Sequence, residues 1–250
     1  MSDPVVRRSE SAGELAERVA ATLISALRRV QDAGRVPSIV LTGGSIAVRI
    51  HEAVAASADQ HLVDWSRVDF WFGDERFVPS DSPDRNVGQA AAAMLDHLPV
   101  DPDRVHAMAA SDGVHGDDVD AAAEAYAEEL RHAAGGQAET PAFDVLMLGI
   151  GPDAHVASLF PEHPALSEDR PVVGVRDSPK PPPTRITLTM RSLQSAREVW
   201  FVAAGGEKAE AVRLAHAGAD VPAAGPKGTE RTLWLLDREA ASRLPPEPTR

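Results

Sequence analysis

The chain has 250 residues, 43% of them hydrophobic and 25% charged, which is the balance of a globular protein with one core, so we expect a single domain spanning residues 1–250. Its formal net charge of −13 argues against nucleic acid and membranes as partners, because either would need a continuous basic face, and leaves an anionic small molecule held by local cations. The absence of cysteine excludes disulfides and thiolate metal sites, while a polar N-terminus and the lack of a long apolar run predict a soluble, cytoplasmic protein.

The first predicted element is an amphipathic helix over residues 11–34. Apolar side chains recur at helical spacing from Leu15 to Val30. Ser11 and Glu14 have the spacing of a capping box, and Gly34 is expected to end the helix.

Alternating strands and helices are predicted along the rest of the chain. The apolar run at residues 36–41 is followed by a glycine turn and a helical pattern that continues through Ala58. Further strands are predicted at residues 68–72, 143–148, 198–204 and 232–236, and further helices at 121–132 and 207–217. This alternation predicts an α/β fold, namely a Rossmann-like three-layer arrangement with a mainly parallel central sheet.

Two polar, proline-containing loops interrupt this alternation, at residues 76–86 and 178–184. Ligands bind beyond the carboxyl ends of the strands in open parallel sheets. We therefore expect the site where these loops meet the segments that follow strands, namely residues 42–45, 73–76, 149–158 and 205–208.

A phosphate-binding turn is predicted at Gly43, Gly44 and Ser45, which lie between a strand and a helix. Glycines allow close approach of an anion to backbone N–H groups, and the helix dipole favours negative charge there. The alternative is that Ser45 is an ordinary helix N-cap.

An acidic pair, Asp74 and Glu75, followed by Arg76, comes just after the strand predicted at residues 68–72. Carboxylates in this position are suited to general acid or base catalysis, and the arginine is suited to binding an anion. The alternative is a solvated turn with a surface ion pair.

The glycine-rich segment 149–155 admits two interpretations. Gly149, Gly151 and Ala154 match the dinucleotide fingerprint G-x-G-x-x-A, but prolines follow too soon for the long helix which that motif requires. Alternatively, His155 acts as a general base, because it follows Asp153 on a glycine loop at a strand end.

Three basic residues are predicted at the edge of the same site. Lys180 lies among prolines, Arg185 begins an apolar segment, and Lys208 follows two glycines at the start of a helix. Together with Arg76 they would suffice to hold one phosphate group, although each alone is equally compatible with a solvated side chain. No histidine spacing is typical of a metal site, so no catalytic metal is expected.

Taken together, these segments resemble the 6-phosphogluconolactonase family. The matching motifs are LTGGS at 41–45, GDERFVP at 73–79, GIGPDAHVASLFP at 149–161 and SPKPPPTRITLT at 178–189, followed by Lys208 after its glycines. The resemblance implies hydrolysis of 6-phospho-D-glucono-1,5-lactone to 6-phosphogluconate, step two of the oxidative pentose phosphate pathway. It also implies a monomer or weak homodimer that needs no cofactor.

The resemblance also implies roles for individual residues. His155 would activate water, and Asp74 and Asp153 would orient that histidine or the substrate. The phosphate would be held by Gly43, Gly44, Ser45, Arg76, Arg185 and Lys208.

Three positions depart from the family pattern. Ala154 replaces the usual glycine, Ile46 and Ala47 replace a Thr-Pro type sequence, and Arg85 replaces the commoner serine. An alanine at position 154 either has a negative φ or introduces backbone strain.

Two alternative functions remain open at this stage. A glucosamine-6-phosphate deaminase would use the same phosphate turn and Asp-x-His loop, but such enzymes carry a glutamate five positions after the histidine, where this chain has Phe160. A phosphosugar-binding protein without turnover is the other alternative, and the presence of His155 with its candidate acids argues against it.

Overall fold

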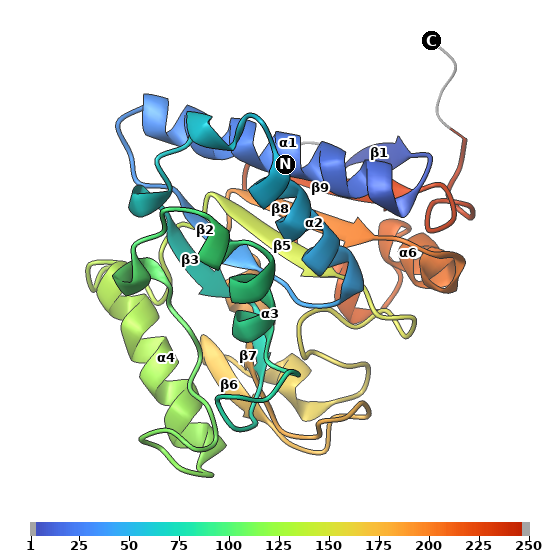
Figure 1. Cartoon of the computed structure of the whole chain (residues 1–250). Helices are drawn as coiled ribbons and strands as arrows, with labels where there is room; N and C mark the ends of the chain where they lie inside the picture. The colour runs from blue at the N-terminus through green and yellow to red at the C-terminus, as the bar shows by residue number, and fades with distance from the viewer. Residues whose placement is uncertain (1–3, 247–250) are drawn as a thin grey trace.

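The computed structural model describes residues 4–246 and has a six-stranded sheet at its centre (Figure 1). The strand order is β1-β9-β8-β5-β2-β3, and every neighbouring pair is parallel, which confirms the predicted parallel sheet. The strands are β1 (Val5–Ser9), β2 (Ser38–Leu41), β3 (Asp69–Phe72), β5 (Val145–Gly149), β8 (Glu198–Ala203) and β9 (Arg231–Asp237).

Two apolar cores lie on opposite faces of this sheet, because successive side chains of a strand point to opposite sides. In β2, Ile39 and Leu41 belong to one core and Val40 to the other. Helices α1 (Ala12–Asp32), α2 (Ser45–Ala56) and α3 (Asn86–Ala93) contribute to the first core, and α4 (Val119–Ala133) and α6 (Ala209–His216) to the second. The three-layer prediction is therefore confirmed.

A second, antiparallel sheet was not predicted from the sequence. It has the order β4-β7-β6, formed by β4 (Asp74–Arg76), β7 (Arg185–Leu188) and β6 (Val172–Val175). The sequence of β4 consists of three charged residues, so no apolar alternation marks it as a strand. Its backbone is instead held by pairing with β7, a long-range contact that local pattern does not reveal.

The capping box predicted at the start of α1 is only half formed. The Ser11 hydroxyl accepts from the Glu14 N–H at 3.2 Å, but the Glu14 carboxylate accepts from the N–H of Glu10 rather than from that of Ser11. Helix α1 ends at Asp32, and Gly34 follows it with φ +75°.

The remaining helices are short. They are α5 (Met190–Leu193) and the 3-10 turns η1 (Gln60–Leu62), η2 (Trp65–Arg67), η3 (Leu95–His97), η4 (Pro102–Arg104), η5 (Pro164–Ser167), η6 (Gly206–Lys208) and η7 (Pro222–Ala224). Among residues 4–246, no helix has the length and apolar character needed to cross a membrane.

Candidate active site

A cavity of about 170 Å³ lies beyond the carboxyl ends of β2 and β5, where the sequence predicted a site. Seven of the nine predicted site residues line it: Gly43, Gly44, Asp74, Arg76, His155, Arg185 and Lys208. The other two, Ser45 and Asp153, are not part of its wall. Segments far apart in sequence thus converge on one cavity.

The turn between β2 and α2 presents backbone donors. Gly44, with φ +98°, is the N-cap of α2, and within the described chain no side chain caps this helix end. The first N–H groups of a helix have no partner inside the helix, so an anion would satisfy them. Ser45 is the first residue of α2 and is exposed, so its interpretation as the N-cap is wrong.

Arg76 and Lys208 supply positive charge to the cavity. One terminal nitrogen of Arg76 donates to the Asp84 carbonyl and to Asn86 Oδ1, which fixes the guanidinium, while its buried Nε has no hydrogen-bond partner in the described chain. Burial lowers the pKa of Lys208, and its ammonium makes no hydrogen bond or ion pair within residues 4–246. Both cations therefore retain donors for an anion.

Arg185 is placed differently from these two cations. Its side chain is buried, and its nitrogens donate to three carbonyls of the proline loop, those of Lys180, Pro181 and Pro182. Nη1 lies 3.9 Å from Asp74 and 3.5 Å from the Ser158 hydroxyl. Most of its donors thus hold the loop, and Nη1 alone remains for a ligand.

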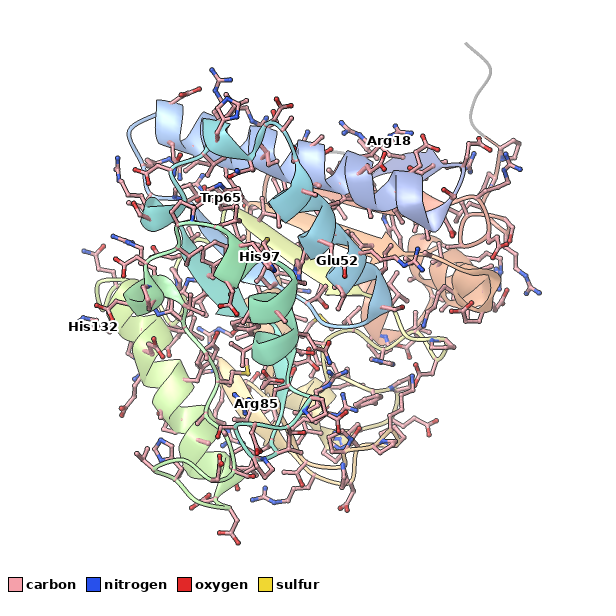
Figure 2. The ribbon with its side chains drawn as sticks, viewed as in Figure 1. Arg18, Glu52, Trp65, Arg85, His97 and His132 are labelled. Carbon is pink, nitrogen blue, oxygen red and sulfur yellow. The ribbon has the colours of Figure 1, made fainter. Side chains whose placement is uncertain are left out.

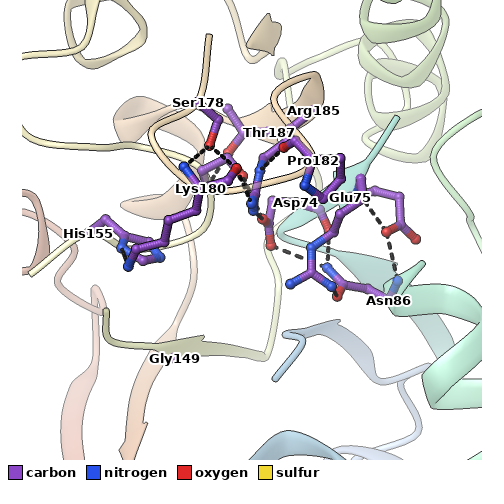
Figure 3. A network of polar contacts seen from close by, with 12 residues as sticks. Asp74, Glu75, Asn86, Gly149, His155, Ser178, Lys180, Pro182, Arg185 and Thr187 are labelled. Carbon is purple, nitrogen blue, oxygen red and sulfur yellow. Dashed lines mark hydrogen bonds and ion pairs between the residues drawn. The ribbon is translucent and has the colours of Figure 1, made fainter. Parts of the chain in front are cut away.

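Asp74 is buried in a network of polar contacts at the cavity wall (Figure 3). Its carboxylate accepts from the Ser158 hydroxyl at 2.7 Å and lies 3.4 Å from the Asn86 amide nitrogen. No hydrogen bond joins Asp74 to His155 among the described residues. Ser158 lies in the matching segment 149–161, but the sequence did not indicate a role for it or for Asn86.

Glu75 has a structural role that the sequence did not reveal. Its carboxylate is fully buried and accepts from the backbone N–H groups of Asn86 at 2.7 Å and Val87 at 2.9 Å, which begin α3. It also accepts from the Arg76 N–H and lies 3.9 Å from the Arg85 guanidinium. Because Glu75 is buried and caps a helix, neither the solvated turn nor a role as general acid or base applies to it.

The loop after β5 holds the His155 ring against the backbone of Gly151, a residue of the same loop. A Cβ atom at Gly151 would lie 1.9 Å from His155 Nδ1, so only glycine leaves room for the ring. Ala154 has φ +62°, which resolves the sequence question in favour of backbone strain, at a cost of about 1–3 kcal/mol. The ring packs on Phe160, with centroids 4.5 Å apart.

The orientation of His155 is set by Asp153. The distance from Nδ1 to Asp153 Oδ1 is 2.5 Å, and an ionised carboxylate only accepts, so Nδ1 carries the proton of this bond. Nε2 then bears the lone pair of the neutral ring, as a general base requires. Burial lowers the pKa of His155, and the Lys180 charge acts in the same direction, while Asp153 opposes both.

The dinucleotide-binding alternative is wrong. The segment from Val156 to His163 forms turns rather than a long helix, and the next helical element is the single 3-10 turn η5. A pyrophosphate site of that type needs the N-terminus of a helix. Residues 4–246 also contain no group of three or more His, Cys, Asp or Glu side chains arranged to hold a metal ion.

Comparisons with known proteins agree with this geometry. The model of the family described as glucosamine-6-phosphate isomerases/6-phosphogluconolactonase matches residues 10–234. A 6-phosphogluconolactonase of Streptomyces coelicolor is 55% identical over 237 residues, covering 92% of this chain and 91% of that protein. Human 6-phosphogluconolactonase is 38% identical, covering 92% and 86%. The structure of 6-phosphogluconolactonase from Trypanosoma cruzi matches with a TM-score of 0.82 at 29% identity, covering 98% of each chain.

Proposed function

Because this chain belongs to the glucosamine-6-phosphate isomerase/6-phosphogluconolactonase family, we propose that it uses His155 to hydrolyse 6-phospho-D-glucono-1,5-lactone to 6-phosphogluconate. This is the second step of the oxidative pentose phosphate pathway. The observation that carries the proposal is that His155, hydrogen-bonded to Asp153, lines the same cavity as the free ammonium of Lys208.

The proposed reaction needs a base and no cofactor. Nε2 of His155 takes a proton from water while the water oxygen bonds to the lactone carbonyl carbon. The tetrahedral intermediate then collapses, the bond from that carbon to the ring oxygen breaks, and the imidazolium returns its proton to the ring oxygen. Asp153 stabilises the imidazolium between these steps, as the carboxylate does in a Ser-His-Asp triad.

Substrate binding is assigned to the other residues that line the cavity. The phosphate would lie on the turn at Gly43 and Gly44, with the N–H of Ser45, and between Arg76 and Lys208. Nη1 of Arg185 contributes from the proline loop. Asp74, whose carboxylate faces the cavity, would accept hydrogen bonds from sugar hydroxyls.

The experiment that tests this function compares two substrates. A deaminase needs a carboxylate beside the histidine to assist ring opening, but Phe160 occupies that position and is buried against the ring. We expect acid release from the lactone and no ammonia release from glucosamine 6-phosphate. Comparable rates with both substrates would contradict the assignment, and inactivity on both would favour a phosphosugar-binding protein.

The pH dependence of kcat/KM should report on His155. Burial holds the pKa of this imidazole below its usual value of about 6.5, so the neutral base persists into mildly acidic solution. Activity is therefore expected to fall on the acid side with a midpoint below that value, once spontaneous hydrolysis is subtracted. A rate that already declines above neutrality as pH falls would contradict the assignment of this base.

Removal of the Lys208 ammonium should weaken substrate binding. The phosphate is bound in both the ground state and the transition state, so we expect Lys208→Ala to raise KM roughly ten- to a hundredfold with little change in kcat. Lys227→Ala is the control, since Lys227 is exposed and lies outside the cavity. A fall in kcat with unchanged KM would instead indicate that Lys208 contacts the reacting atoms.

The proposed function also bears on location and assembly. A phosphorylated lactone is charged and does not cross a lipid bilayer unaided, so the enzyme should share the cytoplasm with its substrate. We further propose that the protein is a monomer or a weak homodimer. Sedimentation at several concentrations would distinguish the two.

A further inference from the structure

We propose that Lys180 is a positioning residue for the reaction, whose ammonium shares the Asp153 carboxylate with His155 and thereby keeps the histidine neutral. This inference deepens the proposed function and depends on His155 acting as the base. It gives Lys180 a task other than holding the phosphate.

Three polar atoms form a triangle, and Figure 3 shows two of the side chains that carry them, Lys180 and His155, close together. Lys180 Nζ lies 3.1 Å from Asp153 Oδ1 and 3.2 Å from His155 Nδ1. The same carboxylate oxygen is the partner of the Nδ1 proton. Because Nδ1 already carries a proton, the ammonium does not donate to it, and the contact becomes repulsive when the ring is protonated.

Lys180 lines the cavity, and its ammonium lies on the Nδ1 side of the histidine ring. The lone pair of the base is on Nε2, at the other side of the ring. Lys180 therefore acts on His155 through charge and through Asp153, and it transfers no proton to the substrate.

The backbone of Lys180 is held in place by two buried side chains. The hydroxyl of Ser178 donates to its carbonyl at 3.0 Å and accepts from its N–H at 3.3 Å. Arg185 Nη2 donates to the same carbonyl at 3.0 Å. Ion pairs on a surface are usually weak because a flexible lysine must be ordered to form them, and here the anchored proline loop reduces that cost.

Charges from several elements act on His155. Asp153, from its own loop, and Asp74, from β4, favour the imidazolium, whereas Lys180, from the proline loop, opposes it. The charge of Lys208, from η6, interacts with those of Lys180 and Asp153. Without Lys180, the two carboxylates would act on the ring with less positive charge to oppose them, and the base would be protonated at a higher pH.

The test follows the titration of His155 directly by NMR. The imidazole Cε1–H signal of the ligand-free protein is recorded against pH and assigned by its loss in His155→Gln. We expect Lys180→Met, which keeps the length of the side chain but removes the charge, to move the midpoint to higher pH. Lys180→Arg and the remote control Lys227→Met should titrate like the parent protein.

Kinetics provide the second readout. The acid limb of kcat/KM in Lys180→Met should move in the same direction, so that its loss of activity is greatest in acid and disappears at the alkaline plateau. An unchanged midpoint in folded Lys180→Met would overturn the proposal, as would a rise in KM at every pH with an unchanged limb. If the parent protein failed to hydrolyse the lactone, the proposed function would be wrong. The NMR midpoints would still show whether the charge of Lys180 lowers the pKa of His155.

Discussion

Replacement of His155 by alanine is expected to lower kcat by about 10²–10⁴, the range typical of a lost general base. The imidazole is needed chiefly when the attacking water loses its proton, whereas the phosphate contacts are made throughout. KM should therefore change much less than kcat. The measurement is the rate of lactone hydrolysis at saturating substrate, from which the rate of spontaneous hydrolysis is subtracted.

A control variant shows whether the effect is specific to His155 or follows from replacing any histidine. His132 is exposed on α4, and Figure 2 shows it at the opposite side of the molecule from α6. His132→Gln should retain the parent kcat. If His155→Ala also kept a near-normal kcat, water would have to be activated by another group, and the role of Asp153 would have to be reassigned with it.

The sequence predicted the large sheet well because its strands carry continuous apolar runs. Buried parallel strands need apolar side chains on both faces, as in β2 and β5, and this signal is local. β1 was missed because its segment contains two arginines and no continuous apolar run. β4 was missed because all its residues are charged and its pairing with β7 joins segments far apart in sequence. β6 and β7, which are short strands on either side of the proline loop, were not predicted either.

For the cavity, the sequence predicted which loops meet but not what each side chain contacts. The rule that ligands bind at the carboxyl ends of parallel strands was enough to bring together the segments around Gly43 and His155. It did not show that Arg185 uses most of its donors on loop carbonyls, or that the buried Glu75 carboxylate binds the first N–H groups of α3. Such partners are set by tertiary packing, and no spacing in the sequence encodes them.

Glu75→Ala is expected to destabilise the protein by about 3–5 kcal/mol, the usual cost of removing one partner from a buried charged pair. The change would leave Arg85 buried without its carboxylate and would leave the first N–H groups of α3 without an acceptor. Urea unfolding at neutral pH measures the loss. Glu52→Ala, at an exposed position of α2, is the control and should stay within about 0.5 kcal/mol of the parent (Figure 2).

Glu75→Gln separates the charge from the hydrogen bonds. One amide oxygen would still accept from the Arg76 and Asn86 N–H groups, but the amide nitrogen would face the N–H of Val87 and the Arg85 guanidinium. An intermediate loss of about 1–3 kcal/mol is therefore expected. Combining it with Arg85→Met removes the unpaired charge, so the second substitution should cost less in the Glu75→Gln background than in the parent. If the two effects simply added, Glu75 and Arg85 would not be coupled, and the helix-capping bonds alone would account for the burial of this carboxylate.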